Sequence, residues 1–77
     1  MKQEKGVWSS LKTFSIGYKD QYGDFTKVWE RGSTRKFETI EDCKTYMNEN
    51  KDWYLENGIT SYKIMQGWNV IEICEVK

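Results

Sequence analysis

Histidine and proline are missing from this 77-residue sequence, and cysteine occurs only twice. Without histidine, the chain lacks the commonest general base and the commonest metal ligand. Cys43 and Cys74 are too few for a disulfide scaffold, and they lack the paired spacing of a zinc or redox motif. We therefore expect both to be buried free thiols in a reducing compartment.

Long apolar runs are also missing. No stretch approaches the roughly 18 apolar residues that a membrane span requires, and the first ten residues, MKQEKGVWSS, contain no apolar signal region. Twelve basic residues balance twelve acidic ones, which argues against a strongly nucleic-acid-seeking surface. The sequence therefore predicts a soluble, cytoplasmic protein with no membrane partner.

Catalytic side chains are equally scarce. The serines, at positions 9, 10, 15, 33 and 61, have no histidine to activate them, and neither cysteine has an evident base partner. Glu41 and Asp42 are explained by the start of a helix, and Glu72 by an outward position in a strand. The six glycines are scattered singly, so they form no phosphate-binding loop. We expect no enzymatic activity, no cofactor and no bound metal.

The first part of the chain has the pattern of a β-hairpin. Phe14, Ile16 and Tyr18 alternate with small or polar residues, which is typical of a half-buried strand. The turn-forming segment KDQYGD follows, and FTKVWER resumes an extended pattern, so residues 11–31 are predicted to form the hairpin. The segment GST after Arg31 is predicted to be a loop.

A second hairpin is predicted over residues 59–76, with Gln66 and Gly67 near its turn. Apolar residues occupy both alternating sets of positions in its last strand, which favours a central place in the sheet. The buried face of this hairpin is expected to contain Tyr62, Ile64, Ile71 and Ile73.

Between the hairpins, Thr39 followed by Asp42 predicts the first turn of a helix with Thr39 as its N-cap. An apolar stripe at helical spacing follows. The helix can end near Asn50, because NENKD is a weak helical stretch, or continue to Asn57 and Gly58; we prefer the longer helix with a break. The expected stripe consists of Ile40, Cys43, Met47 and Tyr54.

These elements together predict one small α+β domain over residues 1–77, with residues 1–6 as a flexible N-terminal segment. The expected order is ββαββ, in which one helix packs on one face of a four-stranded antiparallel sheet.

Aromatic residues make up 16% of the chain, more than one helix and four strands can readily hide. Tyrosine and tryptophan are enriched at the energetic centres of protein interfaces, so we expect some of these rings to contact a partner. The simpler interpretation is that they border a small core, and a sponge for small ligands is a weaker alternative. The expected partner-binding residues are Tyr22, Trp29, Arg31, Arg35, Glu41, Asp42, Trp53, Tyr54 and Trp68.

The segments SIGYKDQYGDFTKVW and KFETIEDCKTYMNEN resemble those of small proteins from phages and mobile elements, in which a hairpin, an F-x-T-x-E-[DE] helix start and further strands form the whole chain. Here that start is Phe37, Thr39, Glu41 and Asp42. The resemblance implies an inhibitor, similar to anti-CRISPR proteins, that occupies the surface of a host or defence protein. A homodimer is a further possibility, since an exposed sheet edge can pair with itself.

Residues 8–50 also resemble the AP2-like arm-binding domain of tyrosine integrases, in which a small sheet docks in the major groove of DNA. That resemblance implies nucleic-acid binding by the first hairpin as the alternative function. Two features differ from the integrase pattern, namely the neutral net charge and the second hairpin. The implied DNA-facing residues are Lys27, Trp29, Arg31 and Arg35, and Lys36 extends this basic run.

Overall fold

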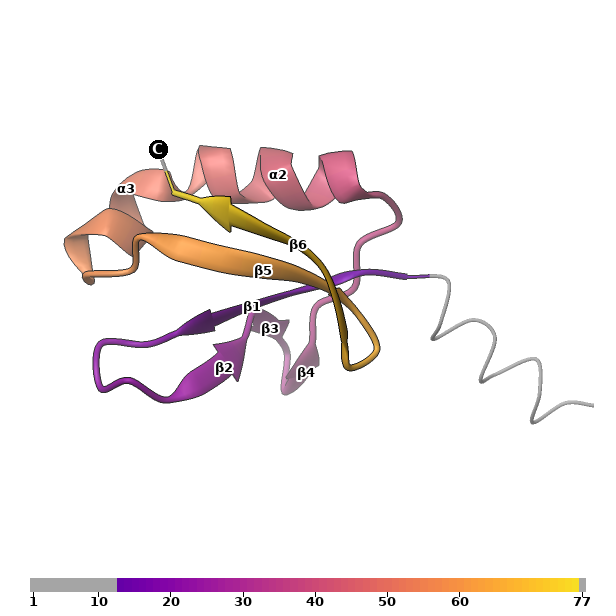
Figure 1. Cartoon of the computed structure of the whole chain (residues 1–77), viewed down its shortest axis with the longest axis horizontal. Helices are drawn as coiled ribbons and strands as arrows, with labels where there is room; N and C mark the ends of the chain where they lie inside the picture. The colour runs from indigo at the N-terminus through magenta and orange to yellow at the C-terminus, as the bar shows by residue number, and fades with distance from the viewer. Residues whose placement is uncertain (1–12, 77) are drawn as a thin grey trace, which may run out of the picture.

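The computed structural model describes residues 13–76, so the expected flexible segment 1–6 lies outside the described residues (Figure 1). A main sheet and a two-stranded sheet are combined with two helical segments. In chain order the elements are β1 (Ser15–Lys19), β2 (Phe25–Lys27), β3 (Trp29–Glu30), β4 (Ser33–Thr34), α2 (Ile40–Glu49), α3 (Lys51–Glu56), β5 (Ser61–Gln66) and β6 (Asn69–Glu75).

The main sheet has four antiparallel strands in the order β2-β1-β5-β6. The predicted α+β class and the four-stranded antiparallel sheet are therefore confirmed. The predicted order ββαββ is incomplete, because an additional short hairpin precedes the helical region and Asn50 divides that region into two helices.

The main buried cluster lies against one face of the main sheet, while Met65, opposite Ser15 on the other face, is buried as well. Directly opposed residues of antiparallel strands point to the same face, and Ile64 lies opposite both Ile16 and Glu72. Ile16 and Ile64 are fully buried, in the same cluster as Cys43 and Met47 of α2. We call this side the core face.

The other face of the sheet carries a row of residues that includes two lysines. Gly17 lies opposite Lys27 on one side and Lys63 on the other, and Lys63 lies opposite Ile73. Because side chains alternate along a strand, this row points away from the Ile16 row. We call this side the lysine face.

The start of α2 follows the prediction. The Thr39 side chain accepts a hydrogen bond from the backbone N–H of Asp42, with an O···N distance of 3.0 Å. This bond satisfies one of the donors that the first turn of a helix leaves unpaired. Thr39 is the N-cap, as predicted.

The helical region also ends as predicted, after a break. Asn50 separates α2 from α3, and its side-chain amide donates to the Tyr46 carbonyl at 2.8 Å. Asparagine side chains compete in this way with the regular backbone bonds of a helix. Beyond α3, Gly58 has a φ of 77°, the left-handed conformation expected just after a helix. The prediction of a long helix with a break is confirmed.

A short hairpin, β3–β4, was not predicted: β3 lies in the segment predicted as the second strand of the first hairpin, and β4 lies in the GST segment predicted to be a loop. Trp29 pairs with Thr34, and Glu30 pairs with Ser33. The turn between them has positive φ at Arg31 (53°) and Gly32 (84°), which suits the right-handed twist of a tight hairpin. With only two pairs of residues, this hairpin has no alternating pattern from which it could be predicted.

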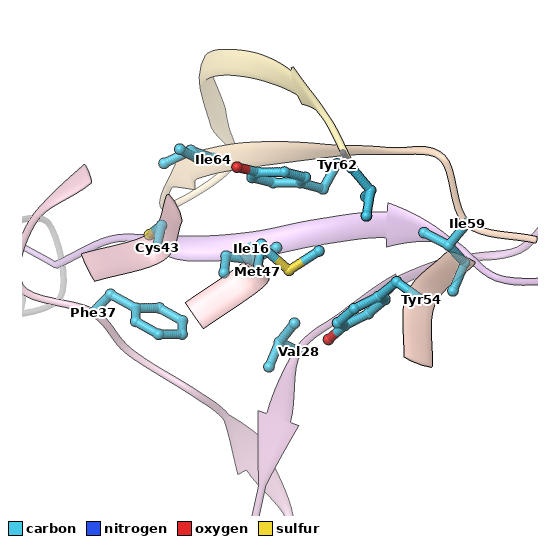
Figure 2. Packing of buried hydrophobic residues seen from close by; sticks show 10 residues of the cluster. Ile16, Val28, Phe37, Cys43, Met47, Tyr54, Ile59, Tyr62 and Ile64 are labelled. Atoms are coloured by element: carbon cyan, nitrogen blue, oxygen red, sulfur yellow. The ribbon is translucent and has the colours of Figure 1, made fainter. Parts of the chain in front are cut away.

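The core lies between the main sheet and the helical region, and Figure 2 shows its side chains converging there. Tyr54 packs edge to face against Tyr18, with ring centroids 5.3 Å apart. Three members of the predicted helical stripe, Cys43, Met47 and Tyr54, are buried. The cluster consists of Ile16, Val28, Phe37, Cys43, Met47, Tyr54, Ile59, Tyr62, Ile64 and Val76.

The predicted central position of the last strand is wrong. β6 is an edge strand, paired only with β5 among the described residues. Glu72 and Cys74 lie opposite Ile64 and Tyr62 on the core face, so Ile73 falls on the lysine face and is 67% exposed. Ile71 is also exposed, next to a register shift between Ile64 and Met65. The second hairpin thus buries Tyr62 and Ile64 but neither isoleucine of β6.

Candidate interaction surfaces

The lysine face carries two aromatic rings with an ammonium group near each. The Phe25 ring lies against Gly17, where an added Cβ would come within 2.4 Å of it. Lys63 Nζ is 6.0 Å from the centre of that ring. The Trp68 side chain is 81% exposed, and Lys27 Nζ lies 4.3 Å from its ring centre, a cation–π distance.

Lys27 is held in place by further contacts. Its ammonium group donates to the Gly67 carbonyl at 3.2 Å, in the turn between β5 and β6. Burial and then the charge of Lys36 lower the pKa of Lys27. This part of the surface therefore concentrates positive charge beside Trp68.

A shallow hollow of about 490 Å³ borders the lysine face at β2. Three aromatic residues, Phe25, Trp29 and Trp68, contribute to its walls together with Lys27. Thr26 of β2, with Gly32, Ser33 and Thr34, completes the lining.

A second candidate surface is the free edge of β6. The N–H of Val76 donates to the Thr60 carbonyl at 2.9 Å. Because antiparallel pairs alternate between bonded and non-bonded, the backbone N–H and C=O of Ile73 point away from β5. Val70, Ile71 and Ile73 are 47%, 44% and 67% exposed. The strand NVIEICE contains no lysine or proline, residues that commonly protect an edge.

The charge in the middle of β6 is already paired. Glu72 Oε2 lies 2.9 Å from Lys44 Nζ of α2, and the interaction lowers the pKa of Glu72 and raises that of Lys44. A chain that approached the β6 edge would therefore meet a compensated carboxylate rather than a free one.

The cysteine thiols sit in different environments. Cys43 is fully buried, and burial raises its pKa to about 11. Cys74 is partly exposed; burial raises its pKa too, and its Sγ contacts Glu72 Oε2 at 3.5 Å. A raised pKa disfavours the reactive thiolate in both. Within residues 13–76, no three acidic or cysteine side chains are grouped so that they could hold a metal ion, and no helix is long and apolar enough to cross a membrane.

The predicted partner-binding aromatics are divided between surfaces. Trp29 and Trp68 line the same hollow beside the lysine face, whereas Trp53 lines a different hollow with Trp29 and residues of the helical region. Tyr22 is 80% exposed in the turn between β1 and β2. Tyr54 is only 4% exposed and belongs to the core, so its ring is not available to a partner.

The predicted charged residues are also dispersed. Arg35 forms an ion pair with Glu30 at 2.6 Å, and its guanidinium lies about 5 Å from the ring centres of Phe37 and Tyr46. Arg31 lies at the tip of the β3–β4 hairpin, so neither arginine joins the row of Lys27. Glu41 and Asp42 lie in the first turn of α2.

Sequence reasoning missed Phe25, Lys63 and Ile73 as surface candidates. The missing information is the strand register, which sets Lys63 and Ile73 in one row with Lys27. The alternation of side chains along a strand could have placed Lys63 on the face opposite to Tyr62 and Ile64.

Comparison with protein-family models, with curated proteins and with solved structures gives no match for this chain.

Proposed function

We propose that this protein is a non-enzymatic binding module that docks on another protein through the free edge of β6. The observation that carries the proposal is the seven-residue edge strand with three exposed aliphatic side chains, Val70, Ile71 and Ile73. Exposed apolar residues on an edge strand favour pairing with another extended chain.

The expected partner segment is an extended strand whose apolar side chains alternate. Its backbone would bond to the outward N–H and C=O of Ile73, and its side chains would pack beside those of β6. Trp68, in the turn that precedes β6, supplies an aromatic anchor at one end of this edge. The sequence resemblance to small phage proteins supports a host or defence protein as the target, which the module would inhibit or modulate by occupying its surface.

The test is affinity capture from a lysate of the native host after nuclease treatment, using the wild-type protein and two variants. Ile73→Lys places a charge at the proposed contact, and Leu55→Lys places one on α3, where Leu55 is 41% exposed. We expect the wild type and Leu55→Lys to retain one stoichiometric protein. Ile73→Lys should lower the affinity for that protein at least about tenfold, a loss of about 1.4 kcal/mol in binding free energy.

Light scattering at two protein concentrations distinguishes a second copy from a different partner. A dimer that Ile73→Lys disrupts would identify the β6 edge as a self-pairing surface and exclude the host-protein target. Equal capture by all three proteins would contradict the proposed role of the edge.

A further inference from the structure

We propose that the lysine face binds single-stranded nucleic acid, with bases stacked on Phe25 and Trp68 and phosphates contacted by Lys27 and Lys63. This site lies beside the β6 edge and shares Trp68 with the protein-binding proposal. It depends otherwise on Phe25 and the strand lysines rather than on the aliphatic side chains of β6, and it does not rest on that proposal. It also differs from the DNA-binding mode implied by the integrase resemblance, since Arg31 and Arg35 lie outside the row.

The strand lysines share one face of the main sheet. Lys27 and Lys63 lie opposite Gly17, and Lys19 lies two residues beyond Gly17 on the same strand, so all three project from the lysine face. Acidic groups are also present: Glu75 lies opposite Ser61, and Asp20 lines a hollow with Lys19 and Phe25. A polyanion that crosses β2, β1 and β5 would thus meet Lys27 on one side of Gly17 and Lys63 on the other.

The rings offer flat surfaces for bases. Gly17 lets the Phe25 ring lie close to the backbone of β1, where it stays 44% exposed. Trp68 extends from the neighbouring turn, with the Lys27 ammonium over its ring. Stacking on such rings tolerates any base, because every base has a π-face, and nearby cations contact the phosphates that link the bases.

The hollow between Phe25, Trp29 and Trp68 extends this platform toward β4. It is open to solvent, and Ser33 and Thr34 of β4 form part of its wall. Bases of a duplex are already stacked and paired, so this arrangement favours a single strand.

Charge on the helical region directs a polyanion to the opposite side of the molecule. Five carboxylates, from Glu41, Asp42, Glu49, Asp52 and Glu56, outnumber the lysines Lys44 and Lys51 in α2 and α3. The helical region is therefore net acidic and repels a polyanion.

The experiment is fluorescence anisotropy with labelled single-stranded probes, oligo(dT) and oligo(U), and with a DNA duplex of the same length. We expect both single strands to bind more tightly than the duplex. With two phosphates neutralised, by Lys27 and Lys63, affinity should fall roughly 7-fold between 50 and 200 mM salt. The ratio of the dT and U affinities distinguishes a DNA ligand from an RNA ligand.

Matched variants locate the site. Trp68→Ala should weaken binding at least about 5-fold, as expected for the loss of one stacked base. Trp53→Ala, which removes a 52%-exposed indole from α3, should leave binding unchanged. Lys63→Ala should reduce the salt slope by about 0.7, whereas Lys51→Ala should not. Far-UV circular dichroism confirms that each variant is folded.

Failure to bind any probe at 50 mM salt would overturn the proposal, as would equal losses in the Trp68 and Trp53 variants. Tighter binding to the duplex would also overturn it. Ile73→Lys separates the two proposals, because it should weaken protein capture at least about tenfold while it preserves or strengthens oligonucleotide binding. Protein capture without oligonucleotide binding would leave the β6 edge as the binding surface and exclude the nucleic-acid site.

Discussion

Two isoleucines on neighbouring strands provide a matched test of the fold. Ile64 of β5 has no exposed surface and lies between Ile16 and Glu72, whereas Ile73 of β6 is 67% exposed. We compare Ile64→Ala with Ile73→Ala, so that the chemical change is identical at both positions. Only the surroundings of the side chain differ between the two variants.

The expected magnitudes follow from burial. Removing the Ile64 side chain loses its full transfer free energy and leaves a cavity, so the free energy of unfolding should fall by about 2–5 kcal/mol. Only about a third of Ile73 is buried, so the loss of three methyl or methylene groups at about 0.8 kcal/mol each scales to roughly 0.8 kcal/mol. The difference between the variants should therefore exceed about 1 kcal/mol.

The assay is equilibrium unfolding in urea, followed by tryptophan fluorescence and by far-UV circular dichroism. Where Ile64→Ala does not fold, Ile64→Val, expected to cost about 0.5–1.5 kcal/mol, is compared with Ile73→Val, which removes the same group from a mostly exposed side chain. A cost at Ile73 equal to that at Ile64 would refute the assignment of β6 as an exposed edge. A wild-type midpoint that rises with protein concentration, and no longer does so in Ile73→Ala, would show that a second copy covers the edge.

Three further predictions concern other parts of the fold. Thr39→Ala should lower the free energy of unfolding by about 1 kcal/mol and Thr39→Ser by much less, measured in urea, because the N-cap bond to Asp42 is lost only in the alanine variant. Gly17→Val should cost about 1–3 kcal/mol in the same assay and change the near-UV spectrum, because its Cβ would displace the Phe25 ring; an unchanged spectrum would contradict this packing. Burial raises the folded-state pKa of Cys43 from 9.0 to about 11, so its contribution to stability is complete below pH 9 and is lost as the pH rises to 11. The urea midpoint should therefore fall less between pH 8 and pH 10.5 in Cys43→Ala than in the wild type. An equal fall in both proteins would contradict the raised pKa of Cys43.

Local signals in the sequence were sufficient for the helical region. The Thr39 cap, the stripe containing Cys43 and Met47, and the left-handed Gly58 depend on residues within a few positions of one another. Capping and helical periodicity are short-range effects, so a single sequence carries them.

The candidate surfaces could not be predicted in the same way. Lys27 and Lys63 are far apart in the chain and become neighbours only through the pairing of β1 with β2 and β5. Tyr54 and Trp53 are adjacent aromatic residues, yet one is in the core and the other is 52% exposed. The helical period already groups Tyr54 with Cys43 and Met47, whereas composition alone makes both rings candidate anchors.

The sequence by itself determined the α+β class, the first and last turns of the helical region and the strand alternation of Phe14, Ile16 and Tyr18, because these follow from local backbone preference and side-chain period. The tertiary structure alone decided that β6 lies at an edge, that Ile73 faces outward and that the strand lysines share one face. Those outcomes depend on strand order and register, which are set by pairing between distant segments. A shift of one residue in register would move every side chain of a strand to the opposite face.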